Sequence, residues 1–312
     1  MQQTDGAGVT HGLGSYAESA CGYSPPVQVG LFAPSSTPGT TPDSLRALAA
    51  AAEERGFHSV WVPEHVIAFD RDASGPRPPV LGGRSGVLDP FVTLGFLAAS
   101  TTTLRLGTGV TLISQRQPLF AAKEAATVDY LSGGRLDLGV GVGWIRQEFE
   151  ALQLRREDRG RLADRNLEIM QTLWVDDVSE YHERGYELAP SRAFPKPVQQ
   201  PHPPIHVGGH SDAALRRVAR YGQGWYAFNL DPEEFGERAR ALDAVMRDHG
   251  RDVAALTVSV CPFLRPVDVD VARQYRDAGA DQLILLAAFD AEKMHASLDR
   301  LATEVVEPAR AF

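Results

Sequence analysis

The chain has few cysteines, no cluster of basic residues and no long apolar run, and each absence excludes a class of protein. Two cysteines in 312 residues, Cys21 and Cys261, provide no disulfide framework, which fits a reducing compartment. With 31 basic and 40 acidic side chains the net charge is -9, which argues against nucleic acid or an anionic membrane as the partner. No apolar stretch reaches the roughly 18 residues of a membrane span, and the N-terminus lacks a secretory signal. We expect a soluble, cytoplasmic enzyme with a small-molecule substrate.

Several familiar catalytic and binding arrangements are also missing. The chain has no Ser–His–Asp order, no zinc spacing and no phosphate-binding P-loop. His202, His206 and His210 are spaced by four, but the run crosses prolines and a candidate strand, so the imidazoles need not converge on a metal. The glycines at 139, 141 and 143 do not follow the Rossmann fingerprint. We therefore expect no metal site and no dinucleotide fold.

What the sequence does contain is a regular alternation of short apolar runs and helical patterns. Residues 1–26 are rich in Gly, Ser, Ala and Gln and predict a disordered N-terminal tail, so residues 27–312 are expected to form one domain. Most of the apolar runs lack polar alternation, as strands covered on both faces do. The eight runs are Val27–Ala33, His58–Pro63, Leu104–Val110, Arg135–Val142, Pro204–Gly208, Gly224–Phe228, Leu256–Phe263 and Gln282–Ala287.

Helix signals separate these runs. Thr41–Pro42 and Asp231–Pro232 each place an N-cap before a proline, and Asp89, Ser211 and Asp290 mark further starts. Eight alternating units over about 280 residues favour a closed (β/α)8 TIM barrel, with an open doubly wound sheet as the alternative. Two stretches are too long for simple connections: residues 64–88 after the second strand, and residues 174–203 before the fifth. The second is expected to hold a hairpin around residues 183–185.

In such a barrel, polar residues just past the strand ends face the active site. Reading those positions gives an imidazole beside a carboxylate, glycines where backbone can approach a ligand, and an aromatic platform. The positions are Glu64, His65, Gly109, Val110, Thr111, Gly143, Trp144, Gln147, Glu148, Gly208, Gly209, His210, Phe228 and Asn229.

Four strings in these regions resemble a known family. They are Trp61–His65, Leu106–Val110, Leu131–Leu136 running into Gly139–Trp144, and Pro203–Gly209. In order and spacing they resemble the luciferase-like monooxygenase superfamily, most closely its branch of oxidoreductases dependent on coenzyme F420, an 8-hydroxy-5-deazaflavin. The resemblance runs from about Val27 to the last helix.

The resemblance implies a flavin-like ring across the mouth of the barrel. It places two catalytic residues there: His65 near the hydride-transferring carbon, as the group that exchanges the proton, and Glu64 beside it, holding the ring or the neighbouring backbone. A histidine titrates near neutral pH and suits this role. The alternatives are a core histidine bonded to backbone and a solvated loop carboxylate.

The cofactor contacts are implied in the same way. The resemblance places a non-proline cis peptide at Gly109–Val110, supporting the ring from behind, with a plain strand-end glycine as the alternative. Gly208 and Gly209, followed by a helix start, suit a phosphate that would also lie near Phe228 and Asn229; a tight turn without a ligand is the alternative. The remaining expected cofactor contacts are Thr111, Gly143, Trp144 and Gln147.

Three functions follow as hypotheses. The first is hydride transfer between coenzyme F420 and a small substrate with a C=C, C=N or carbonyl group. The second is a two-component monooxygenase that uses reduced FMN and receives it from a separate reductase. The third is a non-catalytic flavin-binding barrel. The resemblance also implies a homodimer, for which Leu94, Phe96 and Leu97 are expected to form an apolar face.

Overall fold

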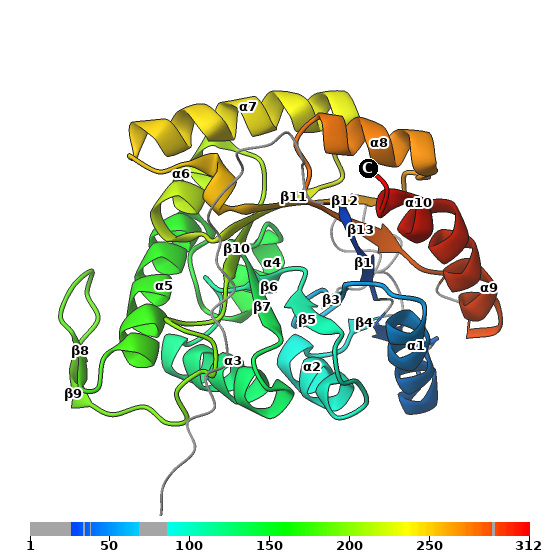
Figure 1. The fold of residues 1–312 in the computed structure, drawn as a ribbon. Helices are drawn as coiled ribbons and strands as arrows, with labels where there is room; N and C mark the ends of the chain where they lie inside the picture. The colour runs from blue at the N-terminus through cyan, green and yellow to red at the C-terminus, as the bar shows by residue number, and fades with distance from the viewer. Residues whose placement is uncertain (1–25, 34, 38, 69–85, 289–290) are drawn as a thin grey trace, which may run out of the picture.

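The computed structural model describes residues 26–33, 35–37, 39–68, 86–288 and 291–312. Within them, parallel strands follow one another around a closed barrel, because β7 pairs with β5 on one side and with β10 on the other (Figure 1). The order around the ring is β10, β11, β12, β13, β1, β3, β5 and β7. This confirms the predicted (β/α)8 barrel and excludes the open sheet.

Each barrel strand lies within a run predicted from the sequence. The strands are β1 (Gln28–Phe32), β3 (Ser59–Val62), β5 (Arg105–Thr108), β7 (Leu136–Gly141), β10 (Ile205–Gly208), β11 (Gly224–Phe228), β12 (Thr257–Phe263) and β13 (Gln282–Leu286). A short additional strand, β6 (Thr111–Leu112), pairs in parallel with the end of β7.

Helices surround the barrel (Figure 1). They are α1 (Pro42–Glu54), α2 (Pro90–Ala98), α3 (Pro118–Ser132), α4 (Arg146–Ala151), α5 (Arg159–Val175), α6 (Asp212–Tyr221), α7 (Pro232–Asp248), α8 (Val269–Asp277), α9 (Ala291–Leu301) and α10 (Glu307–Ala309). Short helical turns lie at η3 (Arg156–Asp158), η4 (Val253–Ala255) and η5 (Ala302–Val306). Among the described residues, none of the helices is both long and apolar enough to cross a bilayer.

The predicted helix starts are N-caps. The hydroxyl of Thr41 accepts the backbone N–H of Ser44 at 3.1 Å, and Asp89, Ser211 and Asp231 cap α2, α6 and α7 in the same way. Each cap satisfies an N–H group that the helix leaves without an internal partner. The start expected at Asp290 lies outside the described residues.

The two insertions differ from each other. The predicted hairpin forms as β8 (Ser179–Tyr181) and β9 (Leu188–Ser191), and Glu168 on α5 ties it to the barrel by accepting the hydroxyls of Tyr181 and Tyr221 at 2.7 and 2.6 Å. Of the insertion expected at 64–88, residues 69–85 lie outside the described residues, and so do residues 1–25 of the expected tail. Two short strands near the first insertion, β2 (Ser36–Thr37) and β4 (Gly86–Val87), pair antiparallel.

The prediction that Leu94, Phe96 and Leu97 form an apolar face for dimerisation is wrong. Leu94 and Leu97 are fully buried in the core between α2 and the barrel, and Phe96 is half-buried beneath the guanidinium of Arg46, 4.6 Å from its ring. These residues have the spacing of one apolar side of a helix. The same spacing occurs on a side that faces the protein core and on a side that faces a partner chain, so the sequence does not distinguish the two.

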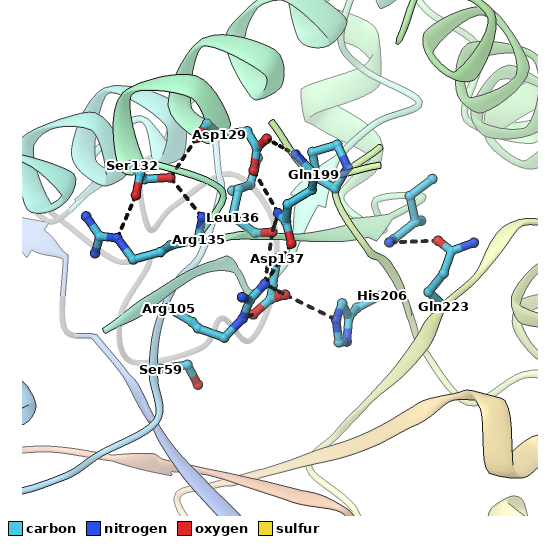
Figure 2. A network of polar contacts seen from close by, with 12 residues as sticks. Ser59, Arg105, Asp129, Ser132, Arg135, Leu136, Asp137, Gln199, His206 and Gln223 are labelled. Carbon is cyan, nitrogen blue, oxygen red and sulfur yellow. Dashed lines mark hydrogen bonds and ion pairs between the residues drawn. The ribbon is translucent and has the colours of Figure 1, made fainter. Parts of the chain in front are cut away.

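A network of polar side chains connects the C-terminal end of α3 with the amino ends of β5, β7 and β10 (Figure 2). The buried carboxylate of Asp137 accepts two bonds from Arg105, at 2.8 and 2.5 Å, and lies 3.8 Å from His206. Burial raises the pKa of Asp137, but His206 and Arg105 outweigh that effect and hold it well below its usual range. Nearby, Asp129 accepts the backbone N–H of Gln199 at 3.0 Å, which fixes the chain entering β10.

One carboxylate outside the barrel connects α1 to the segment that leads into β5. Glu53 on α1 accepts the backbone N–H groups of Thr102, Thr103 and Leu104. Burial raises the pKa of Glu53, but these bonds outweigh it and lower the pKa from 4.5 to about 2. Because the folded pKa is depressed, the stabilisation is present above pH 4.5 and is lost as the pH falls towards 2.

We therefore expect Glu53→Gln to lower the free energy of unfolding by about 1–2 kcal/mol at pH 7, a value reduced for partial exposure. Urea denaturation from pH 7 to pH 2.5 measures it. The difference from wild type should shrink below pH 4.5, and a difference that grows with acidity would contradict this assignment.

Candidate active site at the carboxyl ends of the strands

A cavity of about 480 Å³ opens at the carboxyl ends of the barrel strands. Of the twelve residues expected to be catalytic or to contact the cofactor, nine line it: Glu64, His65, Gly109, Val110, Trp144, Gly208, Gly209, Phe228 and Asn229. The other lining residues are mostly apolar: Phe32, Ala33, Ser35, Ser36, Pro63, Val87, Leu112, Tyr226, Phe263 and Leu264. A largely apolar cavity with few polar groups is typical of a small-molecule or cofactor site.

Three predicted contacts are not part of the cavity wall. Thr111 is fully buried and donates its hydroxyl to Glu64. Gly143 has a positive φ of 71°, and a Cβ there would meet Gln115 Nε2 at 2.8 Å, so it serves a close packing contact. Gln147 lies on α4 and is not among the lining residues.

His65 is held by a buried carboxylate. Its Nδ1 lies 2.9 Å from Oε1 of Glu148, whose side chain is fully buried at the start of α4. This contact engages Nδ1. Because His65 lines the cavity, Nε2 is the ring nitrogen that remains available to a ligand there. The ring of Trp144 meets His65 edge-on, with centroids 6.3 Å apart. Position, orientation and exposure of this imidazole suit a group that exchanges a proton with a bound molecule.

Both carboxylate oxygens of Glu64 are hydrogen-bonded within the protein. Its Oε1 accepts from Arg116 at 2.7 Å, and its Oε2 accepts from the backbone N–H of Leu112 at 2.5 Å and from the hydroxyl of Thr111. The residue is 5% exposed, so the alternative of a solvated loop carboxylate is wrong. With both oxygens engaged, Glu64 fixes the backbone after β5 and positions His65; the geometry does not favour the direct catalytic role expected for it.

Arg116 links several acidic groups. It lies 2.6 Å from Glu64 and from Asp89, and 2.7 Å from Glu124. Burial lowers the pKa of Arg116, but Glu64 and Asp89 more than offset this and raise it above its usual value. The guanidinium is therefore a permanent cation that compensates a buried carboxylate.

The Gly109–Val110 peptide is cis, as the resemblance implies. The N–H of Gly109 donates to the carbonyl of Val62 at 2.7 Å, and a Cβ on Gly109 would meet the hydroxyl of Tyr226 at 2.9 Å. A Cβ on Gly208 would approach Val110 Cγ1 at 3.0 Å. Glycine at both positions keeps this part of the cavity open.

The loop after β10 has only part of the geometry that phosphate binding requires. Gly209 has a φ of +99°, its N–H donates to the carbonyl of Tyr226 at 3.2 Å, and its carbonyl accepts Nε1 of Trp225 at 2.7 Å. Because the Gly209 N–H is used internally, an anion here would contact the first turn of α6. In that turn Asp212 is paired with Arg238 at 2.6 Å.

Among the described residues, no group of three or more His, Cys, Asp and Glu side chains is arranged to hold a metal ion. His202 packs against Trp174, with ring centroids 5.6 Å apart, whereas His206 lies in the barrel interior beside Asp137. These imidazoles do not converge.

Sequence reasoning missed the aromatic residues Phe32, Tyr226 and Phe263. They are apolar or weakly polar residues at strand ends, so the pattern alone assigns them to the core. Glu148 was noted at a strand end, but its pairing with His65 across 83 positions has no sequence signal.

We expect Arg116→Met to lower the free energy of unfolding by about 2–4 kcal/mol at pH 7, because Glu64 is left buried without its cation. Arg247→Met is the matched control: Arg247 is 67% exposed and pairs with Asp243 one turn away, so its loss should cost at most about 0.5 kcal/mol. If urea denaturation gave the same decrease in the free energy of unfolding for both variants, the Glu64–Arg116 pair would contribute no more to stability than an exposed pair.

A family model described as luciferase-like monooxygenase matches residues 27–306. The chain is 33% identical over 285 residues to an uncharacterized protein of Mycobacterium tuberculosis, covering 88% of this chain and 98% of that one. It is 34% identical over 204 residues to the FMNH2-dependent dimethylsulfone monooxygenase of Pseudomonas putida, covering 64% of this chain and 52% of that one.

Among solved structures, the chain resembles an F420-dependent secondary alcohol dehydrogenase in complex with an F420–acetone adduct. The TM-score is 0.75 at 16% identity, covering 91% of this chain and 99% of that one. At this identity the likeness shows the fold alone.

Proposed function

Because the chain belongs to the luciferase-like monooxygenase family, we propose that it is an oxidoreductase that binds coenzyme F420 in this cavity. It would transfer a hydride between the deazaflavin and a small organic substrate with a C=C, C=N or carbonyl group. The observation that carries the proposal is His65 at the cavity wall, with Nδ1 held 2.9 Å from the buried carboxylate of Glu148.

The residues present fit a planar ring with polar edges. Gly109 and Gly208 keep one side of the cavity free of side chains, and the wall is largely apolar. Three buried polar atoms at or beside the cavity have no hydrogen-bond partner among the described residues: Oγ of Ser35, the hydroxyl of Tyr226 and Oε2 of Glu148. Buried polar atoms are usually satisfied, so these three are candidates for contact with a ligand or an ordered water.

The chemistry divides between cofactor and protein. A bound deazaflavin supplies a hydride at its central carbon, the difficult part of the reaction. Reduction of a carbonyl also requires one proton on the oxygen, which His65 would deliver from Nε2; in the oxidative direction Nε2 would accept it. Glu148 would keep the imidazole oriented through Nδ1 and stabilise the ring when it carries two protons.

A second candidate is a monooxygenase that uses reduced FMN and oxygen. It is favoured by the 34% identity to the FMNH2-dependent monooxygenase of P. putida, and the same cavity would hold either ring. The paired His65 and Glu148 argue against the third hypothesis, a barrel that binds flavin without catalysis, because a binding protein has no need of an oriented proton carrier.

A side-by-side fluorescence titration of the purified chain with coenzyme F420 and with FMN tests the proposal. We expect saturable binding of coenzyme F420, at least about tenfold tighter than that of FMN, which corresponds to about 1.4 kcal/mol. Tighter binding of FMN, with oxygen consumption that depends on added reduced FMN, would support the monooxygenase instead.

We expect His65→Ala to lower kcat by about 10²–10⁴-fold while the Kd for the cofactor changes less than about threefold, because the proton carrier is lost and the cavity is retained. Glu148→Gln should lower kcat less and shift the pH profile, since it removes the charge and keeps the shape.

His182→Ala is the matched control, because His182 lies exposed on the β8–β9 hairpin and should leave kcat unchanged. Unchanged turnover in His65→Ala would remove the proposed proton role of His65.

The proposal retains two partners: a second copy of the chain and a separate reductase that supplies the reduced cofactor. Since Leu94 and Leu97 are buried, a homodimer would have to use other side chains. Sedimentation velocity of the full chain gives the oligomeric state directly.

A further inference from the structure

The rim of the cavity is divided into two arcs by the strand order. Going around the barrel, β3, β5, β7 and β10 are consecutive neighbours, and so are β11, β12, β13 and β1. The first arc carries His65, Gly109–Val110, Trp144 and Gly208–Gly209 just past its strand ends. The proposed proton carrier and most of the expected cofactor contacts therefore lie on one side of the cavity.

The second arc carries three phenylalanines, which we call the aromatic wall: Phe32 at the end of β1, Phe228 at the end of β11 and Phe263 at the end of β12. The rings of Phe32 and Phe263 meet edge-to-face with centroids 5.7 Å apart, and those of Phe228 and Phe263 are 5.1 Å apart. Such spacings are those of interacting aromatic pairs. Phe263 touches both of the other rings and is the centre of the wall.

The backbone at Phe263 is unusual. Its φ is +58°, in the left-handed region that bulky residues rarely adopt, and the pairing of β12 with β13 shifts register between Val260 and Phe263. A glycine would adopt this conformation without strain. Strained residues of this kind cluster at ligand sites, so a phenylalanine held in this conformation at the cavity wall is a candidate for contact with a ligand.

The described part of the cavity wall offers little to an anionic substrate. No lysine or arginine side chain belongs to its wall in the described part of the chain. The carboxylate of Glu64 is already engaged by Arg116, Thr111 and Leu112. A carboxylate or phosphate on the substrate would lose its hydration at the aromatic wall without gaining a cation from the residues that the structure describes there.

We propose that the aromatic wall is the substrate subsite, and that it selects an uncharged substrate whose hydrocarbon or aromatic part packs on Phe263, Phe228 and Phe32. This inference rests on the proposed function, which places coenzyme F420 in this cavity, and it puts the cofactor along the first arc. A ring bound along the first arc has its open face towards the aromatic wall, so a substrate lying between them is placed for reaction next to His65. Phe228, expected from the sequence as a cofactor contact, belongs on this account to the substrate side.

The test uses the full-length chain, with and without bound coenzyme F420, and benzylideneacetone as the probe. This uncharged enone has a phenyl ring and a reducible C=C bond; its para-carboxylate analogue differs by one charge. Phe263→Gly removes the ring and suits the backbone at φ +58°, so it should fold. Phe263→Leu keeps an apolar side chain, Phe228→Leu is a second site on the wall, and Phe120→Leu changes a 70% exposed phenylalanine on α3 as the control.

In calorimetric titration we expect Phe263→Gly to weaken binding of benzylideneacetone roughly tenfold, with Phe263→Leu and Phe228→Leu in between and Phe120→Leu unchanged. The Kd for coenzyme F420 should change less than about threefold in all four variants. The para-carboxylate should bind the wild type at least about tenfold more weakly than its parent. In turnover, Phe263→Gly should raise KM more than it lowers kcat.

Three results would overturn the inference: no binding of benzylideneacetone to the wild type, equal binding of the parent and the para-carboxylate, or loss of cofactor affinity in Phe263→Gly in place of probe affinity. Failure of the proposed function looks different. In that case the wild type would not bind coenzyme F420, whereas the probe would still bind in a way that depends on Phe263, which would support the subsite alone.

Discussion

The site depends on one buried ion pair. Glu64, directly after β3, receives bonds from Arg116, Thr111 and the N–H of Leu112, and so joins the end of β3 to the segment that follows β5. Its neighbour in sequence, His65, projects into the cavity, and the segment it anchors carries Gly109–Val110. A buried carboxylate is tolerated only when it is compensated, so the position of the site and the charge of Arg116 are linked.

The fold was predictable because local signals and packing agree in this chain. Proline after an N-cap residue at positions 42, 90 and 232 marks helix starts that the structure places at the same residues, and unbroken apolar runs mark strands covered on both faces. The alternation of these units leaves few topologies open. The prediction of the dimer face was wrong because the helical spacing of Leu94 and Leu97 indicates that they are buried, and does not indicate whether the core or a partner chain covers them.

The position of the site was predictable from the sequence, and the contacts between its side chains were less so. Strand ends identify which residues meet at the rim, so His65, Gly109 and Gly208 could be placed together from the sequence. The contacts between side chains depend on distances that sequence spacing does not encode: Glu148 reaches His65 from a helix after β7, and Phe263 reaches Phe32 across β13. Thr111, expected as a cofactor contact, donates its hydroxyl to Glu64 and is not part of the cavity wall.

A crystal structure of the chain grown with oxidised coenzyme F420 tests the central claim most directly. We expect the deazaflavin ring inside the cavity, against Val110 on one side and facing the aromatic wall on the other, with Nε2 of His65 directed at its central ring. Density for the ring outside the cavity, or a His65 side chain turned away from it, would contradict the account.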